Sequence, residues 1–344
     1  MYFLTSSRLS ILDILNKHVI HNNNPIETKQ SKMTFTTHTS FLDLISKYDG
    51  FILDQFGVMH NGSNALPGAV DVVQRLHKEG KKLVILSNTS SPSSSALNKL
   101  PKLGFDPKCF MGAITSGEEA AKYIVKNFVG KKALLISWKD NPATDVFLGL
   151  CGNPMLVDDP NDADYIIAHG MQAVWGCSSQ GDEKNVRVVT DLSASLWEKG
   201  DFSELDPILK TCAERRLPMV NANPDFTCVV ADGSHKPMPG KIASRYEGFG
   251  GKCTYFGKPH AEHFEACVRQ IGLPKDRIVH VGDSLHHDIA GANETGISCI
   301  FVSSGIHKDE LGTEFGNLPS IESLESLFAK EGQTPSHVVP ALSF

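Results

Sequence analysis

Two short apolar runs in the first third of the chain each stop at a polar residue. Phe51-Ile52-Leu53 ends at Asp54, and the run 83–86 ends at Ser87. The residues between them, 67–80, begin with proline, carry apolar side chains at helical spacing and close with glycine. This order is typical of a strand, a helix and a second strand. Such units predict neighbouring parallel strands and therefore restrict the chain to an α/β fold.

The same pattern returns near the C-terminus. The run 278–281 leads to Asp283, a second apolar run covers 297–302, and Phe264 begins a helical repeat just before them. The middle of the chain also alternates, and it is too long to be a connecting loop. Its candidate strands are Ala133–Ile136, Tyr165–Ala168, Met219–Val220 and Cys228–Val230. We therefore expect a Rossmann-like α/β core with a parallel sheet, interrupted by an inserted α/β cap domain.

The expected domain boundaries follow from this pattern. Residues 1–40 form a leader, 41–115 the first part of the core, 116–250 the α/β cap, 251–330 the second part of the core, and 331–344 an extended tail. The leader lacks the continuous apolar stretch of a secretory signal. It is interpreted as a disordered segment, with a transit peptide for a mitochondrion or plastid as the alternative.

Composition limits the classes of function that remain. The chain has 344 residues and a net charge of −6, which argues against electrostatic binding of nucleic acid. It has no apolar stretch long enough to cross a membrane. Its eight cysteines form no C-x-x-C pair, which favours reduced thiols and a cytoplasmic location.

Functional side chains follow the predicted strands where each strand ends. In open α/β sheets, ligands bind beyond the carboxyl ends of the strands, and Asp54, Ser87 and Asp283 all lie there. Each alone could be an ordinary turn or capping residue. Together, two carboxylates suit Mg²⁺, while Lys258 and the hydroxyl and amide groups at Ser87-Asn88 suit a phosphate. The combination indicates phosphoryl transfer.

Four segments, in order, resemble the motifs of the haloacid dehalogenase (HAD) superfamily. They are Phe51–Val58, Leu86–Thr89, Gly257–His260 and Val281–Asp288. Further segments are similar to subfamily IIA, which includes phosphatases of the 4-nitrophenyl phosphate and phosphoglycolate type. These are Leu66–Ala69, Ile114–Glu118, Asn223–Asp225 and Pro239–Lys241. The resemblance covers about residues 45–315.

The resemblance implies a nucleophile and a metal site. Asp54 would attack phosphorus and form an aspartyl-phosphate. Asp54 and Asp283 would hold Mg²⁺ together with the backbone carbonyl of Phe56. Asp288 would support the metal site from outside the set of direct ligands.

The resemblance also implies how a substrate is held. Ser87 and Lys258 would hold the phosphoryl group, with Asn88 beside them. Asn223 and Asp225, in the cap, would help to select the substrate. The expected partner is a small phosphorylated metabolite, rather than nucleic acid or a membrane, and the cap is the expected contact of a homodimer.

One departure from the family pattern affects the chemistry directly. The family has Asp-x-Asp in its first motif, but this chain has Asp54-Gln55-Phe56. In the phosphatases, the second Asp protonates the leaving group and then activates water, and loss of such a group costs about 10²–10⁴ in rate. His60 is the nearest titratable substitute, although the interpretation as an ordinary turn histidine without a catalytic role is favoured. Alternatively, the natural substrate has a good leaving group, or Phe56 excludes water and favours phosphotransfer.

The sequence therefore favours a Mg²⁺-dependent phosphatase or phosphotransferase that acts on a small phosphate ester through Asp54. The alternative is a catalytically degenerate HAD-fold protein that binds a phosphorylated ligand. Phe56 supports that alternative, whereas the retained Asp54, Lys258 and Asp283 argue against it.

Overall fold

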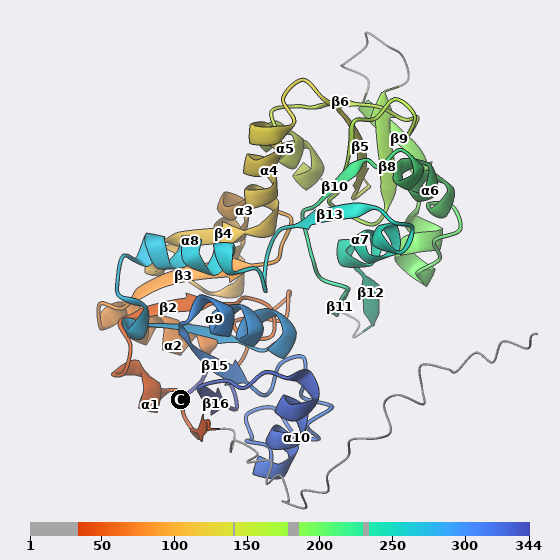
Figure 1. The fold of residues 1–344 in the computed structure, drawn as a ribbon. Helices are drawn as coiled ribbons and strands as arrows, with labels where there is room; N and C mark the ends of the chain where they lie inside the picture. The colour runs from red at the N-terminus through yellow and green to blue at the C-terminus, as the bar shows by residue number, and fades with distance from the viewer. Residues whose placement is uncertain (1–33, 140–141, 178–185, 230–233) are drawn as a thin grey trace, which may run out of the picture. The chain divides into compact units, whose positions relative to one another are not determined.

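The computed structural model describes residues 34–139, 142–177, 186–229 and 234–344, which form two seven-stranded sheets and one two-stranded hairpin (Figure 1). The first sheet has the order β1-β16-β15-β14-β2-β3-β4, and all its pairings are parallel. Its strands are β1 (Thr36–Thr37), β2 (Gly50–Leu53), β3 (Lys82–Ser87), β4 (Gly112–Thr115), β14 (Ile278–Gly282), β15 (Ser298–Val302) and β16 (His337–Val339).

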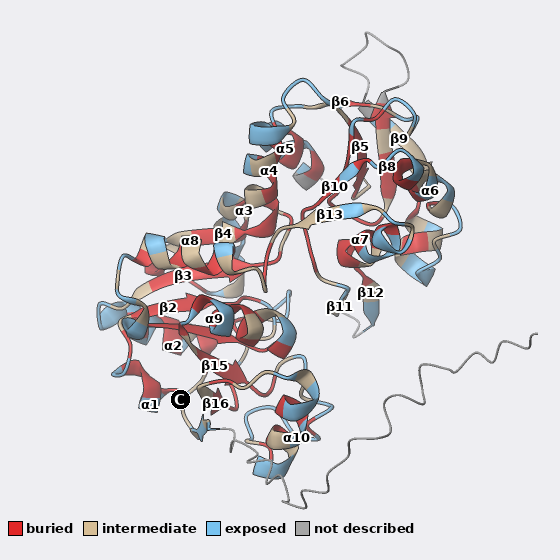
Figure 2. Cartoon of the chain, in the orientation of Figure 1, coloured by how far each residue is buried: buried red, intermediate tan, exposed pale blue. Residues whose placement is uncertain are grey.

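Apolar side chains explain why this sheet lies at the centre of the core. β2 and β14 are buried along their whole length, as expected of parallel strands covered on both faces (Figure 2). Phe51 and Leu53 of β2 pack with the buried side of the helix α2 in one apolar cluster. The first sheet is accompanied by α1 (Leu42–Ile45), α2 (Ala69–Lys78), α3 (Ser93–Lys99), α8 (Ala261–Ile271), α9 (Ala290–Thr295) and α10 (Ile321–Glu331).

The second sheet is formed by the inserted part of the chain. Its order is β13-β10-β7-β5-β8-β9, with β6 paired to β5, and only the β5–β8 and β8–β9 pairings are antiparallel. The strands are β5 (Lys132–Ser137), β6 (Met155–Leu156), β7 (Tyr165–Ala168), β8 (Ala173–Cys177), β9 (Val186–Asp191), β10 (Pro218–Asn221) and β13 (Lys252–Tyr255). A separate hairpin joins β11 (Thr227–Val229) and β12 (His235–Pro237).

Alternating side chains give the second sheet two buried faces. Leu134 and Ile136 of β5 pack in one apolar cluster with residues of α6 (Asp206–Glu214) and α7 (Pro239–Gly248). Ala133 and Leu135 of the same strand belong to another cluster, with residues of α4 (Ser116–Asn127) and α5 (Pro142–Leu150). Helices therefore cover both faces, as predicted for an α/β cap.

The fold class is confirmed, since the second sheet interrupts the parallel sheet between β4 and β14. Two strand pairings differ from the expected boundaries. β1, within the expected leader 1–40, pairs with β16, within the expected tail 331–344, so both segments contribute to the first sheet. β13, placed in the second part of the core from residue 251, pairs with β10 and lies in the second sheet. Among the described residues, no helix is both long and apolar enough to cross a membrane.

Candidate active site

The predicted functional residues follow three strands that are neighbours in the first sheet. Asp54 directly follows β2, Ser87 is the last residue of β3, and Asp283 directly follows β14. The strand order β14-β2-β3 places their carboxyl ends side by side. The amide of Asp54 extends the ladder by donating to the carbonyl of Val281, at 2.9 Å. The parallel sheet thus brings together side chains that are far apart in the sequence.

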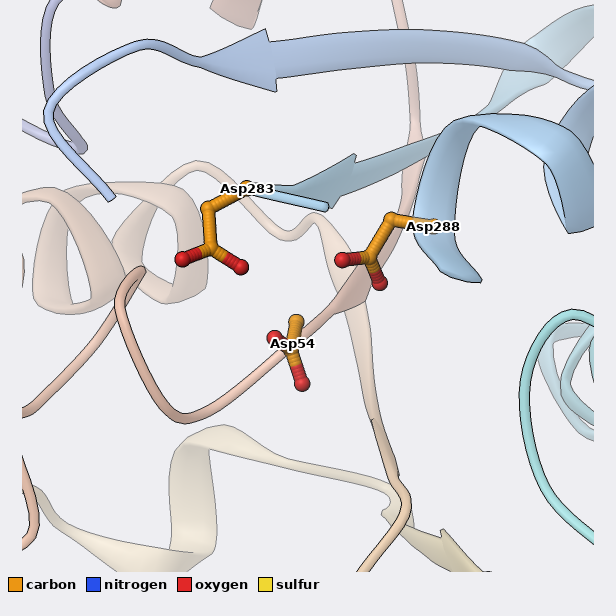
Figure 3. A group of neighbouring side chains, drawn as sticks. All are labelled: Asp54, Asp283 and Asp288. Atoms are coloured by element: carbon orange, nitrogen blue, oxygen red, sulfur yellow. The ribbon is translucent and has the colours of Figure 1, made fainter. Parts of the chain in front are cut away.

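Three buried carboxylates form the centre of the site (Figure 3). Asp54, Asp283 and Asp288 each offer an oxygen that lies within 4.8 Å of the others. Burial, assisted by the charge of Asp288 and opposed by Lys258, raises the pKa of Asp54 to about 6. Burial, followed by the charges of Asp54 and Asp288, raises the pKa of Asp283 well above its usual range. Such a set of hard, mutually repelling oxygens fits a divalent cation.

Lys258 neutralises part of this negative charge. Its Nζ lies 2.6 Å from Oδ1 of Asp54 and 2.8 Å from Oδ1 of Asp288, and its side chain is only 4% exposed. Burial acts to lower the pKa of Lys258, but Asp288 and Asp54 outweigh it and hold this pKa above its usual range. Lys258 therefore carries a fixed positive charge beside the predicted nucleophile.

Asp288 is held by two further donors. Nε2 of His280, inside β14, lies 2.8 Å from Oδ1 of Asp288, and the amide of Ser284 donates to its Oδ2 at 3.0 Å. Burial acts to raise the pKa of Asp288, but Lys258 and His280 hold it below its usual range. Asp288 is therefore a charged anchor for Lys258, a role consistent with support from outside the direct ligands.

Asp283 is positioned by backbone groups. The amide of Ile306 donates to its Oδ2 at 2.8 Å. A Cβ on Gly57 or on Gly305 would overlap the Asp283 carboxylate, so both backbones approach it closely. Gly57 also has a φ of +80°, a conformation that favours glycine. The peptide group between Phe56 and Gly57, which includes the Phe56 carbonyl, therefore lies next to the Asp283 carboxylate.

Asn88 connects the loop after β3 to Lys258 and to Asp225. Its Oδ1 accepts from the amide of Lys258 at 2.7 Å, and its Nδ2 donates to Oδ1 of Asp225, also at 2.7 Å. Ser87 is buried, and its Oγ accepts from the amide of Thr89 at 3.3 Å. The structure therefore brings Asn88, Lys258 and Asp225 together. Ser87, the last residue of β3, directly precedes Asn88.

The predicted substrate-selecting pair has two different environments. Asn223 is 3% exposed, and its Oδ1 accepts from the amide of Asp225 at 2.9 Å, so this side chain shapes its own turn. The side chain of Asp225 is 27% exposed and meets Asn88. Burial raises the pKa of Asp225 to about 6, against the opposing effects of Asn88 and Lys258.

Phe56 and His60 lie in one loop. The ring of Phe56 is 41% exposed and packs edge-on against His60, with 6.3 Å between the ring centroids. Nδ1 of His60 accepts from the amide of Gly62 at 3.1 Å, and burial lowers the pKa of His60. These contacts lie within the loop and describe an ordinary turn histidine.

Two histidines of the site were missed by sequence reasoning. His280 lies inside a buried strand, and His287 lies in the short π-helix η6 (Leu285–Ile289), with Nδ1 3.9 Å from Oδ1 of Asp225. A polar residue inside the apolar run 278–281 was the available signal for His280.

Three family models match the chain. A haloacid dehalogenase-like hydrolase model matches residues 51–145, another of the same description matches 188–296, and a HAD-hydrolase-like model matches 255–342. These matches include every segment that carries the three carboxylates and Lys258.

Relatives and solved structures agree with these models. Chronophin from Homo sapiens is 26% identical over 273 residues, which cover 78% of this chain and 85% of chronophin. A 4-nitrophenylphosphatase from Schizosaccharomyces pombe is 24% identical over 281 residues, covering 78% of this chain and 88% of the relative. A haloacid dehalogenase-like hydrolase from Brucella suis 1330 has the same fold, with a TM-score of 0.66 at 21% identity, covering 88% of this chain and 98% of that chain.

Proposed function

Because this chain belongs to the haloacid dehalogenase superfamily, we propose that it is a Mg²⁺-dependent phosphatase of small phosphate esters that works through Asp54. The observation that carries this proposal is the contact between Asp54 and Lys258, at 2.6 Å, beside Asp283 and Asp288. A nucleophile, a fixed cation and a second carboxylate are the parts that phosphoryl transfer needs.

In the proposed reaction, an Oδ of Asp54 attacks phosphorus and the bond from phosphorus to the ester oxygen breaks, which leaves an aspartyl-phosphate. Water then attacks this phosphorus and releases phosphate and the free Asp54 carboxylate. Lys258 offsets the negative charge of the phosphoryl oxygens, and Asp288 holds its ammonium in place.

The metal site is proposed from the chemistry of its donors. Asp54 and Asp283, with the backbone carbonyl of Phe56, would hold the ion, and Asp288 would support them. When bound, Mg²⁺ supplies positive charge that lowers the repulsion between the carboxylates and the phosphate. The close approach of Gly57 to Asp283 supports the Phe56 carbonyl as a ligand.

The test is phosphate release from 4-nitrophenyl phosphate by the full chain, with Mg²⁺ or with EDTA. We expect turnover that requires Mg²⁺ and falls to the EDTA level in Asp54→Asn. Asp71→Asn is the control, because Asp71 is an exposed aspartate on α2, away from the strand ends. A wild-type protein that binds inorganic phosphate but hydrolyses neither aryl nor alkyl esters would overturn the enzyme in favour of a degenerate phospholigand-binding protein.

The remaining expectations stay predictions. A small phosphorylated metabolite fits a site of this charge, whereas the homodimer through the cap awaits a measurement of mass in solution. The cytoplasmic location, with a mitochondrion or plastid as the alternative, depends on residues 1–32, which lie outside the described residues.

A further inference from the structure

The site described above has a nucleophile but no acid at the position where the family places one. Phe56 has no ionisable group, and its ring is 41% exposed. His60 is engaged within its own loop, where Nδ1 accepts from Gly62. Hydrolysis of an ester whose leaving group is a strong base needs a proton from another residue.

The turn that carries Asp225 is packed tightly against the loop before Lys258. A Cβ on Gly257 would lie 3.0 Å from Pro224, and a Cβ on Gly240 would lie 2.6 Å from the carbonyl oxygen of Asp225. Both positions therefore require a small residue. This packing fixes the backbone of Asp225 beside the active-site loops.

The side chain of Asp225 is directed to the phosphate-holding groups. Its Oδ1 accepts from Nδ2 of Asn88, whose Oδ1 accepts from the amide of Lys258, and each contact is 2.7 Å. Nζ of Lys258 in turn contacts Asp54 at 2.6 Å. The side chain of Asn88 therefore bridges the carboxyl group of Asp225 and the backbone of Lys258, the residue that contacts Asp54.

The second carboxyl oxygen of Asp225 is open to a ligand. Within the described ranges, no hydrogen bond to Oδ2 is recorded, and the side chain is 27% exposed, against 11% for Asp54 and 1% for Asp288. The charged and titratable groups around Asp225 are Lys258, Asp288, His287 and the Cys228 thiol, and burial raises the pKa of Asp225 to about 6. A carboxyl group of this kind can both give and accept a proton near neutral pH.

We propose that Asp225 is the general acid and base of this enzyme, in the role that Phe56 cannot fill. This inference rests on the proposed function. As Asp54 bonds to phosphorus and the ester bond breaks, the leaving oxygen takes the proton of the Asp225 carboxyl group and departs as an alcohol. In the second half, the Asp225 carboxylate takes a proton from the attacking water, while the bond between Asp54 and phosphorus breaks. Both steps balance without another reactant.

The experiment compares two leaving groups in wild type and Asp225→Asn. Asn keeps an acceptor for Asn88 and loses the ionisable proton. 4-Nitrophenolate leaves with little need of a proton, whereas the alkoxide of glycerol 3-phosphate needs one. We expect the ratio of kcat/KM for the alkyl ester to that for the aryl ester to fall by about 10²–10⁴ in Asp225→Asn.

A rescue and two controls complete the test. Adding Phe56→Asp to Asp225→Asn restores an acid at the family position, so the ratio rises again. Asp201→Asn removes an exposed carboxylate of the inserted part and leaves the ratio unchanged. An equal loss on both esters in Asp225→Asn, or no loss, overturns the inference. The same change of ratio in His60→Asn, in place of Asp225→Asn, also overturns it.

Failure of the proposed function has a different signature. In that case wild type and Asp54→Asn hydrolyse 4-nitrophenyl phosphate at the same rate. No reaction through Asp54 then exists in which Asp225 could act as the acid. If turnover depends on Asp54 but Asp225→Asn leaves the ratio of kcat/KM for the alkyl and aryl esters unchanged, only the role of Asp225 is rejected.

Discussion

Gly57 shows how one backbone position decides whether the acidic cluster can form. Its φ of +80° is a conformation that costs other residues about 1–2 kcal/mol, and a Cβ there would overlap the Asp283 carboxylate. Gly80 has a similar φ of +73°, but a Cβ there would meet nothing within 4 Å. Comparing substitutions at Gly57 and Gly80 therefore distinguishes the effect of backbone strain from the effect of displacing Asp283.

We predict that Gly80→Ala loses about 1–2 kcal/mol of stability from backbone strain, and that Gly57→Ala loses at least as much. Only Gly57→Ala is expected to displace Asp283 and weaken activation by Mg²⁺, by at least about tenfold. Denaturant unfolding measures the first effect, and Mg²⁺ dependence of 4-nitrophenyl phosphate turnover measures the second. Equal Mg²⁺ activation in both variants would contradict the close approach of Gly57 to Asp283.

His280 is the second residue that supports the site from within the core. It is fully buried, and its Nε2 is bonded to the charged Asp288 at 2.8 Å. We predict that His280→Leu lowers the free energy of unfolding by about 1.5–3 kcal/mol, the range for a hydrogen bond to a charged group. His280→Gln keeps a donor and is expected to recover part of this loss in urea unfolding. A more stable Leu variant would show that the bond contributes nothing.

At the scale of elements, β16 makes the C-terminal segment part of the core. It pairs with β15 on one side and β1 on the other, and Val338, Val339 and Leu342 are 0–1% exposed. Full burial of one such side chain contributes about 1.5–3 kcal/mol, so their sum approaches the whole stability of a domain.

We therefore predict that a chain ending at Gly332 fails to fold, as judged by circular dichroism and a missing thermal transition. Removal of Phe344 alone is the control, since this residue is 50% exposed. Its melting temperature is expected to stay within a few degrees of wild type. A truncated chain that melts like wild type would mean that β16 is dispensable.

For the whole molecule, proton and metal binding compete for the same carboxylates. The pKa of Asp54 is raised to about 6, and that of Asp283 lies well above its usual range. Without metal, Asp54 stabilises the folded state at low pH and loses this contribution as pH rises through about 6. With metal, the sign reverses, because Mg²⁺ binds the deprotonated site.

We predict that saturating Mg²⁺ raises the melting temperature more at pH 7.5 than at pH 5.5. The difference is expected to shrink in Asp54→Asn, which removes one titrating ligand. Differential scanning calorimetry with Mg²⁺ or EDTA at both pH values is the measurement. A larger Mg²⁺ effect at pH 5.5 would contradict a site built on these carboxylates.

The sequence predicted those parts of the fold and site that depend on neighbouring residues. Asp54 follows an apolar strand and Asp283 follows a strand that is apolar except for His280, and a parallel sheet brings such strand ends together. The pairing of Thr36 with His337 joins residues 301 positions apart, and strands of two or three residues leave no periodic pattern. The contact between Asn88 and Asp225 joins residues 137 positions apart, and only the family resemblance placed both residues at the site. The role of His280 was not predicted, because its partner Asp288 is positioned by the π-helix η6 that follows β14.

Lys258 follows β13 of the second sheet, whereas Asp54 and Asp288 belong to the first. The charge balance of the nucleophile thus depends on residues that follow strands of both sheets. Separating them would leave buried carboxylates without their cation, which costs about 3–5 kcal/mol for a broken buried pair. The two sheets are therefore expected to unfold in one cooperative thermal transition. Heat that unfolds either sheet also removes the contact between Lys258 and the nucleophile Asp54.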